Sequence, residues 1–225
     1  MSRFFPLFMI AAALAGKQKA EPLLRLDEAA AVVRELMATP DRSIPQDLLD
    51  KAQCIVIVPG LKKGAFILGG KYGKGYISCR KRGAGWSAPG TVRVEGGSVG
   101  LQIGGSASDV IMLVMNERGV NKLLASKFTL GGEGAVAAGP VGREATAQTD
   151  AMMHAEILSW SRSQGLFAGV SLQGATLRQD LSDNAVIYGR KLTNKEIVQS
   201  SMPVPNAANG LISVLNKYSP AKNSN

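Results

Sequence analysis

The chain has few of the residues from which metal sites and most catalytic sites are built. Among its 225 residues there is one histidine, His154, there are two cysteines, and only 5% of the residues are aromatic. One histidine cannot form a histidine-rich metal site, and no group of cysteines or carboxylates has the spacing of metal ligands. We therefore expect neither a metal nor another cofactor, and we interpret His154 as a strand residue with a local hydrogen bond.

Carboxylates are missing from one long stretch, residues 51–94. This window carries nine of the 26 Lys and Arg residues and none of the 17 Asp and Glu residues, so the remaining chain is balanced at 17 cations and 17 anions. The formal charge of +9 is therefore local, and a local excess of cations predicts a surface for a negatively charged partner. The candidate binding residues are Lys62, Lys63, Lys71, Lys74, Arg80, Lys81, Arg82 and Arg93.

Alternation within residues 74–82 places part of this charge on one face of a predicted strand. Side chains two residues apart share a face, so Lys74, Arg80 and Arg82 are expected together, while Ile77 and Cys79 point the other way. Because the second face is apolar, the cationic face is predicted to be exposed to solvent.

The N-terminal apolar run is too short for a membrane-spanning helix, which needs about 20 residues. Arg3 precedes the run Phe4–Ala15, which ends in the A-x-A sequence Ala13-Leu14-Ala15. This order of features is typical of a secretory signal peptide. We expect residues 1–15 to be a signal peptide and the protein to be exported to the periplasm or cell envelope, with a retained N-terminal anchor as the alternative.

The two cysteines, Cys54 and Cys79, permit two states. In an oxidising compartment a disulfide would close a loop of 26 residues, which corresponds to about 3 to 4 kcal/mol in the chain-entropy model. Two buried free thiols are the other state, and this is the interpretation we favour.

The apolar periodicity and the 26 glycines predict an α+β protein with short strands and tight turns. Residues 22–38 form the clearest helix, with Pro22 at its first position, and residues 45–52 a second. Either could lie on a membrane, but both charge signs on the polar face favour packing on a sheet. Further helices are expected at 118–126, 180–188, 193–200 and 210–218, and strands at 54–58 (closed by Pro59-Gly60), 64–72, 74–82, 91–95, 98–103 and 109–116, with two more in 151–173.

These elements predict one domain at residues 22–200, built on a strongly twisted, mainly antiparallel sheet or partial barrel with flanking helices. Residues 201–225 are expected to form a linker, a short helix and a disordered tail.

One sequence pattern matches that of a hydrolase. Residues 96–100 have the form G-x-S-x-G around Ser98, but a nucleophile elbow needs a strand–turn–helix context and a later histidine. His154 would have to be the base, oriented by Asp109 or Asp150, while the residues after Ser98 read as a strand and a turn. We therefore expect no enzyme activity.

Two other anion-binding arrangements fit the window less well than a membrane surface. Residues 69–75 (GGKYGKG) lack the order of a Walker A loop, although their amides could form a small anion nest beside Lys71 and Lys74. Tyr72 and Tyr76 are too few for a nucleic-acid stacking platform, so we expect no nucleic-acid partner. A membrane surface fits better, because each cation near an anionic leaflet contributes about 1 kcal/mol to the free energy of binding.

A series of motifs extends over about residues 26–199. In chain order they are Ile44-Pro45 with Ala52, Val58-Pro59, Gly69-Gly70-x-x-Gly73-x-Gly75, Gly85-Trp86-Ser87-x-Pro89, Gly100-x-Gln102-x-Gly104, Ala138-Gly139-Pro140, Trp160-Ser161-Arg162-Ser163-x-Gly165-Leu166, Ala168-Gly169-Val170-Ser171-Leu172-x-Gly174, and Asn184 with Tyr188-Gly189. This series resembles the SYLF lipid-binding domain family, with Trp160 in place of the tyrosine expected there.

The resemblance implies a non-enzymatic domain that binds anionic lipid, including phosphoinositides in eukaryotic members, through an N-terminal amphipathic helix and basic surface residues. Some fungal members bind actin, usually beside an SH3 domain, but for an exported protein we do not expect actin as a partner. The expected ligand is phosphatidylglycerol, cardiolipin or another acidic envelope component. The alternative is a structural protein of the envelope that docks an acidic protein or polysaccharide.

Overall fold

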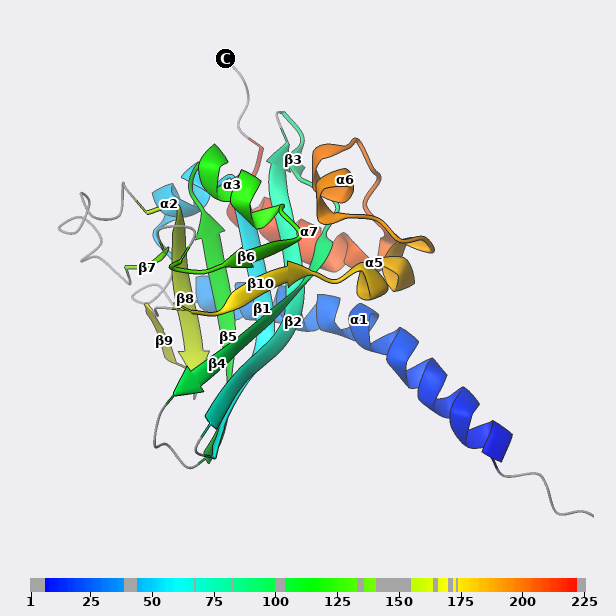
Figure 1. The fold of residues 1–225 in the computed structure, drawn as a ribbon. Coiled ribbons are helices and arrows are strands. Elements are labelled where there is room, and N and C mark those ends of the chain that lie inside the picture. The colour runs from blue at the N-terminus through cyan, green and yellow to red at the C-terminus, as the bar shows by residue number, and fades with distance from the viewer. Residues whose placement is uncertain are drawn as a thin grey trace, which may run out of the picture.

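A strongly curled β-sheet with flanking helices forms the body of the molecule (Figure 1). The structure is a computed structural model, and it describes residues 7–38, 44–66, 68–81, 83–99, 104–132, 136–140, 155–163, 166–169, 172 and 174–221. The predicted α+β class and partial barrel are confirmed. His154, Arg82 and the predicted turn at residues 164–165 lie outside the described residues.

Ten strands make up the sheet in the described part of the chain. They are β1 (Cys54–Phe66), β2 (Leu68–Lys81), β3 (Gly85–Trp86), β4 (Gly90–Val99), β5 (Gly104–Val114), β6 (Lys127–Thr129), β7 (Val136–Ala138), β8 (Ile157–Ser163), β9 (Leu166–Gly169) and β10 (Thr176–Gln179). Their order is β6-β10-β4-β2-β1-β5-β8-β7, with β3 beside β2 and β9 beside β8. Of these pairings only β7 with β8 is parallel, so the sheet is mainly antiparallel, as predicted.

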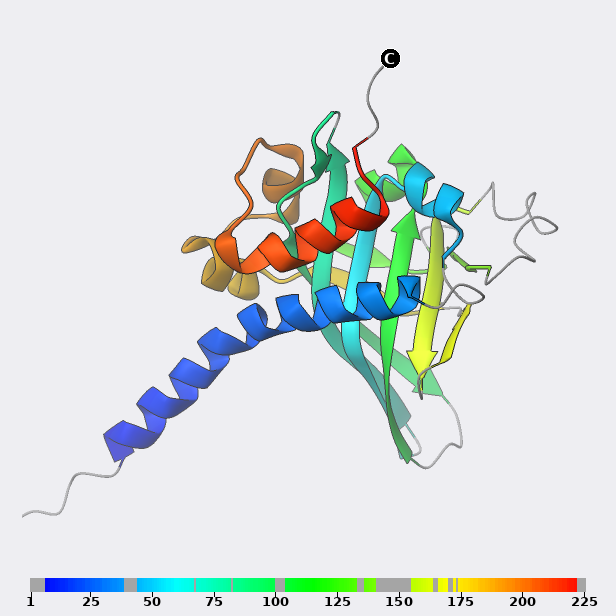
Figure 2. The ribbon, with the colours of Figure 1, turned by 180° about the vertical axis from the view of Figure 1, so that it is seen from behind.

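The two faces of the sheet carry separate hydrophobic cores. On the face that we call outer, Ile57, Tyr76 and Trp160 pack in a cluster with residues of the long helix α1 (Leu7–Met37) and of α7 (Asn209–Tyr218), which cross this face in Figure 2. On the other, inner face, Val58 and Ile77 belong to a second cluster that also contains residues of β4, β6 and β10. Strands β6 and β10 cross in front of β1 and β5 in Figure 1, so the sheet curls around its inner core.

The remaining described helices are short. They are α2 (Gln46–Lys51), α3 (Glu117–Leu123), α5 (Leu181–Tyr188), α6 (Asn194–Gln199) and the 3-10 helix η2 (Asn206–Ala208). Together with α7 they confirm the helices predicted at 45–52, 118–126, 180–188, 193–200 and 210–218. Because α7 buries Leu211, Ile212 and Leu215 in the outer core, the segment after residue 200 is packed into the body of the protein.

Helix α1 is longer than the helix predicted at residues 22–38. It begins at Leu7 and contains Pro22, so the prediction that Pro22 opens the helix is wrong. A proline inside a helix has no N–H to donate to the carbonyl of the preceding turn. The carbonyl of Pro22 itself accepts a hydrogen bond from the Tyr76 hydroxyl. The N-terminal half of α1 extends away from the sheet (Figure 2) and includes the predicted cleavage site at residues 13–15. Within the described residues, no helix combines the length and the apolar character needed to cross a membrane.

Strand β1 does not end at Pro59-Gly60, contrary to the prediction. The register with β5 shifts between Val58 and Leu61, which marks a β-bulge, and the strand then continues to Phe66. Gly60 has a φ of 58°, a left-handed conformation that glycine adopts without steric cost. Its backbone N–H donates to Asp109 Oδ1 at 2.9 Å. The Pro-Gly pair therefore bends one long strand, because neighbouring strands continue the pairing beyond it.

The glycine-rich run at residues 69–75 lies within β2 and is not a loop. All of these residues pair with β4, and those before Gly73 also pair with β1. Their amides belong to a sheet, so the predicted anion nest is wrong. A glycine is required at Gly75, because a Cβ atom there would lie 2.0 Å from the carbonyl oxygen of Ile57.

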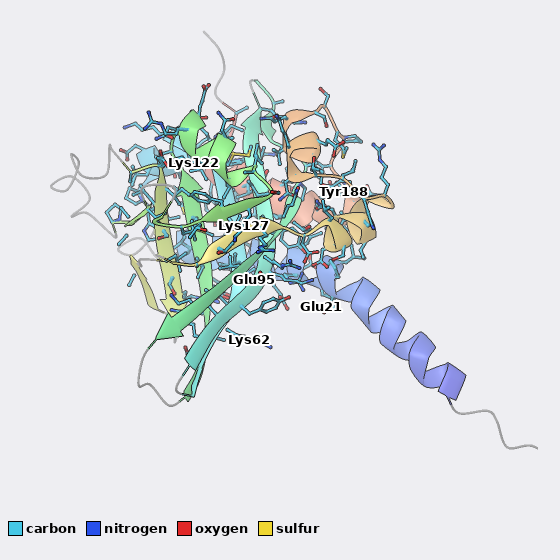
Figure 3. All side chains as sticks on the ribbon, in the orientation of Figure 1. Glu21, Lys62, Glu95, Lys122, Lys127 and Tyr188 are labelled. Carbon is cyan, nitrogen blue, oxygen red and sulfur yellow. A yellow bond between two sulfur atoms is a disulfide. The ribbon has the colours of Figure 1, made fainter. Side chains whose placement is uncertain are left out.

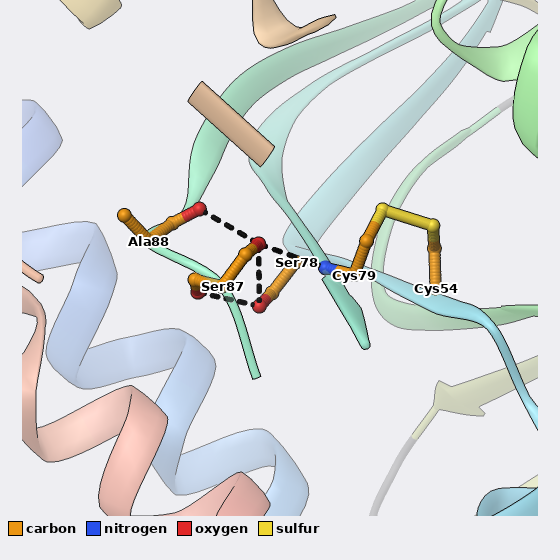
Figure 4. Close-up of a disulfide and its surroundings, with 5 residues drawn as sticks. All are labelled: Cys54, Ser78, Cys79, Ser87 and Ala88. Atoms are coloured by element: carbon orange, nitrogen blue, oxygen red, sulfur yellow. Dashed lines mark hydrogen bonds between the residues drawn. A yellow bond between two sulfur atoms is a disulfide. The ribbon is translucent and has the colours of Figure 1, made fainter. Parts of the chain in front are cut away.

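Cys54 and Cys79 form a disulfide (Figure 4), so the favoured interpretation of two free thiols is wrong. The two residues are direct cross-strand partners in β1 and β2, a relation that only the strand pairing reveals. Ser87 holds β2 from the other side, since its Oγ accepts a hydrogen bond from the Cys79 backbone N–H at 3.0 Å.

We predict that Gly75→Ala lowers the free energy of unfolding by about 1 to 3 kcal/mol, the usual cost of overpacking. The reason is that the new methyl group meets backbone of β1, which cannot move without breaking the ladder. Gly64→Ala is the matched control in the same sheet, because a Cβ there has no heavy atom within 4 Å. Urea denaturation of both variants checks this, and equal losses would contradict the close approach.

Candidate functional site

The cations of the window 51–94 lie on different surfaces of the sheet. In β2, Lys74, Tyr76, Ser78 and Arg80 share one face, as the alternation predicted, but that face is the outer one. Tyr76 is 1% and Ser78 2% exposed, because helices cover them. The prediction of a solvent-exposed cationic face is therefore wrong for this part of the strand.

Lys74 belongs to a cluster of opposite charges that joins three elements. Its Nζ lies 2.9 Å from Asp180 Oδ2 and 3.0 Å from Asp183 Oδ1, both at the start of α5. Asp183 Oδ2 also accepts a hydrogen bond at 3.0 Å from Arg25 of α1. We call Arg25, Lys74, Asp180 and Asp183 the charge cluster. It connects α1, β2 and α5 through partly buried ion pairs.

The charge cluster shifts the pKa values of its members in the directions expected for ion pairs. Burial alone would lower the pKa of Lys74, but hydrogen bonds to Asp180 and Asp183 outweigh it and raise that pKa. Burial would raise the pKa of Asp180, yet hydrogen bonds from Ser182 and Lys74 lower it below its usual value. Both groups are therefore charged at neutral pH and form an ion pair with each other.

Arg80 anchors the C-terminal segment. Its Nη1 donates to the backbone carbonyls of Ser219 and Pro220, each at 2.9 Å, and its guanidinium lies 4.4 Å from the ring centroid of Trp86. Trp86 Nε1 also donates to the Ser219 carbonyl at 3.0 Å. Burial lowers the pKa of Arg80, and Asp50 partly offsets this. Arg80 is therefore a structural residue with little of its charge available to a ligand.

Two further predicted cations have other surroundings. Arg93 Nε lies 2.7 Å from Glu95 Oε1, so a carboxylate neutralises it. Lys81 lines a cavity of about 910 Å³ together with the disulfide. This cavity lies at the end of the sheet where β1 begins and β2 ends.

Three lysines occupy the opposite end of the sheet, which we call the hairpin end. Here β1 ends at Phe66, β2 begins at Leu68, β4 ends at Val99 and β5 begins at Gly104. Lys62, Lys63 and Lys71 lie near this end, and within the described ranges none has an ion pair with a carboxylate. In Figure 3, Lys62 lies farther toward the hairpin end than Glu95.

The three lysines divide between the two faces. Lys62 is opposite Tyr72 of β2, on the outer face, whereas Lys63 is opposite Lys71. Lys63 and Lys71 share the inner face with Leu61, which belongs to the inner core. At the hairpin end, one lysine on the outer face and two on the inner face thus lack carboxylate partners in the part of the chain described; Lys81, at the other end of the sheet, also lacks one there.

The sequence reasoning missed two serines of the same inner surface. In β5, Ser106 is the register partner of Lys63, and Ser108 that of Leu61. The period-2 spacing of these serines ahead of the buried run 110–114 was a signal, because it places both on one face. Without the pairing of β1 with β5, nothing connects them to the lysines.

The motif residues that carry the family resemblance have structural roles. Asn184, which is fully buried, accepts from the Thr91 backbone N–H at 2.8 Å and donates to the Leu192 carbonyl at 2.8 Å. Tyr188 donates to the Pro89 carbonyl at 2.7 Å. These two motif residues therefore fix α5 against β4 and the loop before it.

The context of a nucleophile elbow is not found around Ser98, which lies within β4. Asp109, one of its two candidate partners, accepts from the Gly60 backbone and from Arg162 Nε at 2.8 Å. Asp150 and His154 lie outside the described residues. The arrangement around Ser98 therefore gives no support to a serine hydrolase.

We predict that Lys74→Gln lowers the free energy of unfolding by about 2 to 3 kcal/mol, because it removes the cation shared by two partly buried carboxylates of α5, of which only Asp183 keeps Arg25. Lys62→Gln, the matched control on the same face, should change it by less than about 0.5 kcal/mol. Urea denaturation at pH 7 measures both. A Lys74→Gln variant of unchanged stability would show that the charge cluster does not hold α5 and α1 on the sheet.

Comparison with known proteins identifies the family. The family described as "Ysc84: Las17-binding protein actin regulator" matches residues 95–218, more than half of the chain. Protein YSC84 of Saccharomyces cerevisiae is 34% identical over 180 residues, which cover 78% of this chain and 38% of the yeast protein. SH3 domain-containing protein PJ696.02 of Schizosaccharomyces pombe is 37% identical over 176 residues, or 77% of this chain and 41% of that protein.

A human relative is similar over the same extent. SH3 domain-containing YSC84-like protein 1 of Homo sapiens is 31% identical over 180 residues, which cover 80% of this chain and 52% of the human protein. The chain thus spans only about two fifths to half of the length of these curated relatives. The family-wide match and the shared motifs lead to one conclusion: the chain belongs to the Ysc84 (SYLF) family, a family of binding domains.

Proposed function

We propose that this protein binds anionic lipid headgroups at a membrane of a bacterial cell envelope, without catalysing a reaction, through the lysines of the hairpin end. The observation that carries the proposal is the group Lys62, Lys63 and Lys71 on adjacent strands, with no carboxylate paired to them among the described residues. The other predicted cations with known placement are mostly held in structural contacts. Membership of a family of binding domains supports a role without catalysis.

Three lysines are enough for a measurable membrane affinity. Each cation near an anionic leaflet contributes about 1 kcal/mol, so three acting together correspond to about a 100-fold enrichment at the surface. Arg80 and Lys74 add little to this sum, because hydrogen bonds and ion pairs already occupy them. The affinity should fall as salt rises, since exposed charges are screened within a Debye length of about 8 Å at physiological ionic strength.

The location in the envelope is part of the proposal. The Cys54–Cys79 disulfide supports an oxidising compartment, because disulfides persist in secreted and periplasmic proteins and are rare in the cytosol. The family is described as an actin regulator, but an exported protein does not meet actin, so we do not include actin among the partners.

We predict that the protein sediments with phosphatidylglycerol-containing vesicles and not with pure phosphatidylcholine vesicles. A triple variant, Lys62→Glu, Lys63→Glu and Lys71→Glu, should lose this binding. The matched control reverses three exposed cations away from the hairpin end, Arg190, Lys191 and Lys195, and should keep most of it although its net charge is the same.

Equal losses of vesicle binding in the two triple variants would mean that net charge alone drives binding, and would contradict the proposed site. Capture of an acidic protein or polysaccharide from envelope extract, without any vesicle binding, would favour the docking alternative. Sedimentation with actin filaments would contradict the assignment of partners.

We predict that the protein expressed with its full N-terminus is exported and begins at Gly16. Intact mass measurement of the periplasmic fraction checks this, because cleavage after Ala15 removes a defined mass. Recovery of the whole chain from the membrane fraction would instead support a retained N-terminal anchor.

A further inference from the structure

Two lysines face each other across adjacent strands on the inner face. Lys63 of β1 and Lys71 of β2 are direct register partners, and both are half-buried. Directly opposed side chains in an antiparallel pair have Cβ atoms about 4.5 to 5.5 Å apart, so like charges at such positions repel each other and destabilise the sheet.

Carboxylates of the neighbouring strands β4 and β5 do not relieve the repulsion, because they lie on the outer face. Glu95 pairs there with Arg93, and Asp109 with Arg162. The row that crosses the inner face at Lys63 and Lys71 is completed by Ser106 of β5 and Gly96 of β4. In the described part of the chain this inner row therefore carries two positive charges, one hydroxyl group and no negative charge.

An independent observation points to a ligand at the same place. Ser108 is 5% exposed, and its Oγ is a buried oxygen with no hydrogen-bond partner among the described residues. It lies on the inner face in the next row, as the register partner of Leu61. A buried hydroxyl without a partner costs free energy, so native structures rarely keep one unless something else satisfies it.

We propose that Lys63, Lys71, Ser106 and Ser108 form a phosphate-binding site on the inner face of the curled sheet. Two ammonium groups neutralise a phosphate group, and the hydroxyls donate hydrogen bonds to its oxygens. This inference rests on the proposed function, because it assumes the same class of anionic ligand. It adds the location of the site, which lies inside the curl of the sheet and does not include Lys62 of the outer face. The phosphate can belong to a lipid headgroup or to a soluble phosphate ester.

The site couples phosphate binding to stability. Without an anion, Lys63 and Lys71 oppose folding of the hairpin end, whereas a bound phosphate converts their repulsion into attraction. A ligand that binds only the folded state raises the melting temperature as its concentration exceeds its Kd. Removing one lysine should therefore make the protein more stable and less responsive to phosphate at the same time.

The test compares Lys71→Gln with Lys62→Gln, which removes the same charge from the outer face. Thermal unfolding is followed in glycerol phosphate and in sodium chloride of equal ionic strength, and vesicle binding is measured with phosphatidylglycerol. We expect Lys71→Gln to raise Tm by about 2 °C in sodium chloride, to lose the additional rise in glycerol phosphate, and to bind vesicles about fivefold more weakly. Lys62→Gln should keep the wild-type Tm and the wild-type response to glycerol phosphate.

Ser108→Ala is a second variant. If the Ser108 hydroxyl stabilised the fold, this substitution would lower Tm. Because it removes an unpartnered buried hydroxyl, we expect an unchanged or higher Tm in sodium chloride together with a smaller response to glycerol phosphate. A lower Tm in Lys71→Gln, or equal effects of Lys62→Gln and Lys71→Gln on the phosphate response, would overturn the site.

The two proposals fail in different ways. Vesicle binding by a protein whose Tm does not respond to glycerol phosphate, or responds equally without Lys62 and without Lys71, would leave lipid binding in place and overturn the inner-face site. A response to glycerol phosphate that requires Lys71, without any vesicle binding, would support the inner-face site with a soluble phosphate ester as its ligand, and would overturn lipid binding as the function.

Discussion

The attachment of helix α1 and helix α5 to the sheet depends on one cluster of opposite charges. Lys74 of β2 contacts both aspartates at the start of α5, and Asp183 in turn contacts Arg25 of α1. Acidic residues at a helix N-terminus also interact favourably with its dipole. Partly buried ion pairs of this kind cost several kcal/mol to break, since a remaining charge keeps its desolvation penalty. The cluster therefore adds to the burial of apolar residues of α1, such as Leu26 and Leu36, in fixing the helices on the outer face of the sheet.

This covering divides the basic window into two functional parts. Cations under the helices, such as Lys74 and Arg80, are held by carboxylates or by backbone carbonyls of the C-terminal segment. Lysines near the hairpin end have no ion pair with a carboxylate among the described residues, and they are the cations that we propose for an external anion. The net charge of the window thus overestimates the number of cations available to a ligand, because some of them form ion pairs and hydrogen bonds within the fold.

Much of the fold could be predicted from local patterns. The amphipathic stripe after Leu26 and the β-branched run at residues 54–58 identified a helix and a buried strand, because burial on one face or both leaves a period in the sequence. The prediction failed where tertiary pairing overrides a local signal. Pro59-Gly60 reads as a strand end, yet β5 continues the ladder past the bulge at Gly60. Pro22 reads as a helix start, yet it lies inside α1.

The family, the α+β class and the concentration of positive charge in residues 51–94 can all be read from the amino-acid order. The contacts of Cys54 with Cys79 and of Lys74 with Asp180 and Asp183, and the position of Lys63 opposite Lys71, arise only in the folded chain. The physical reason is that alternation along a strand assigns side chains to two faces, whereas strand register and helix packing decide which residue stands opposite. For charged groups, that opposite residue decides whether a cation stabilises the fold or remains available to a ligand.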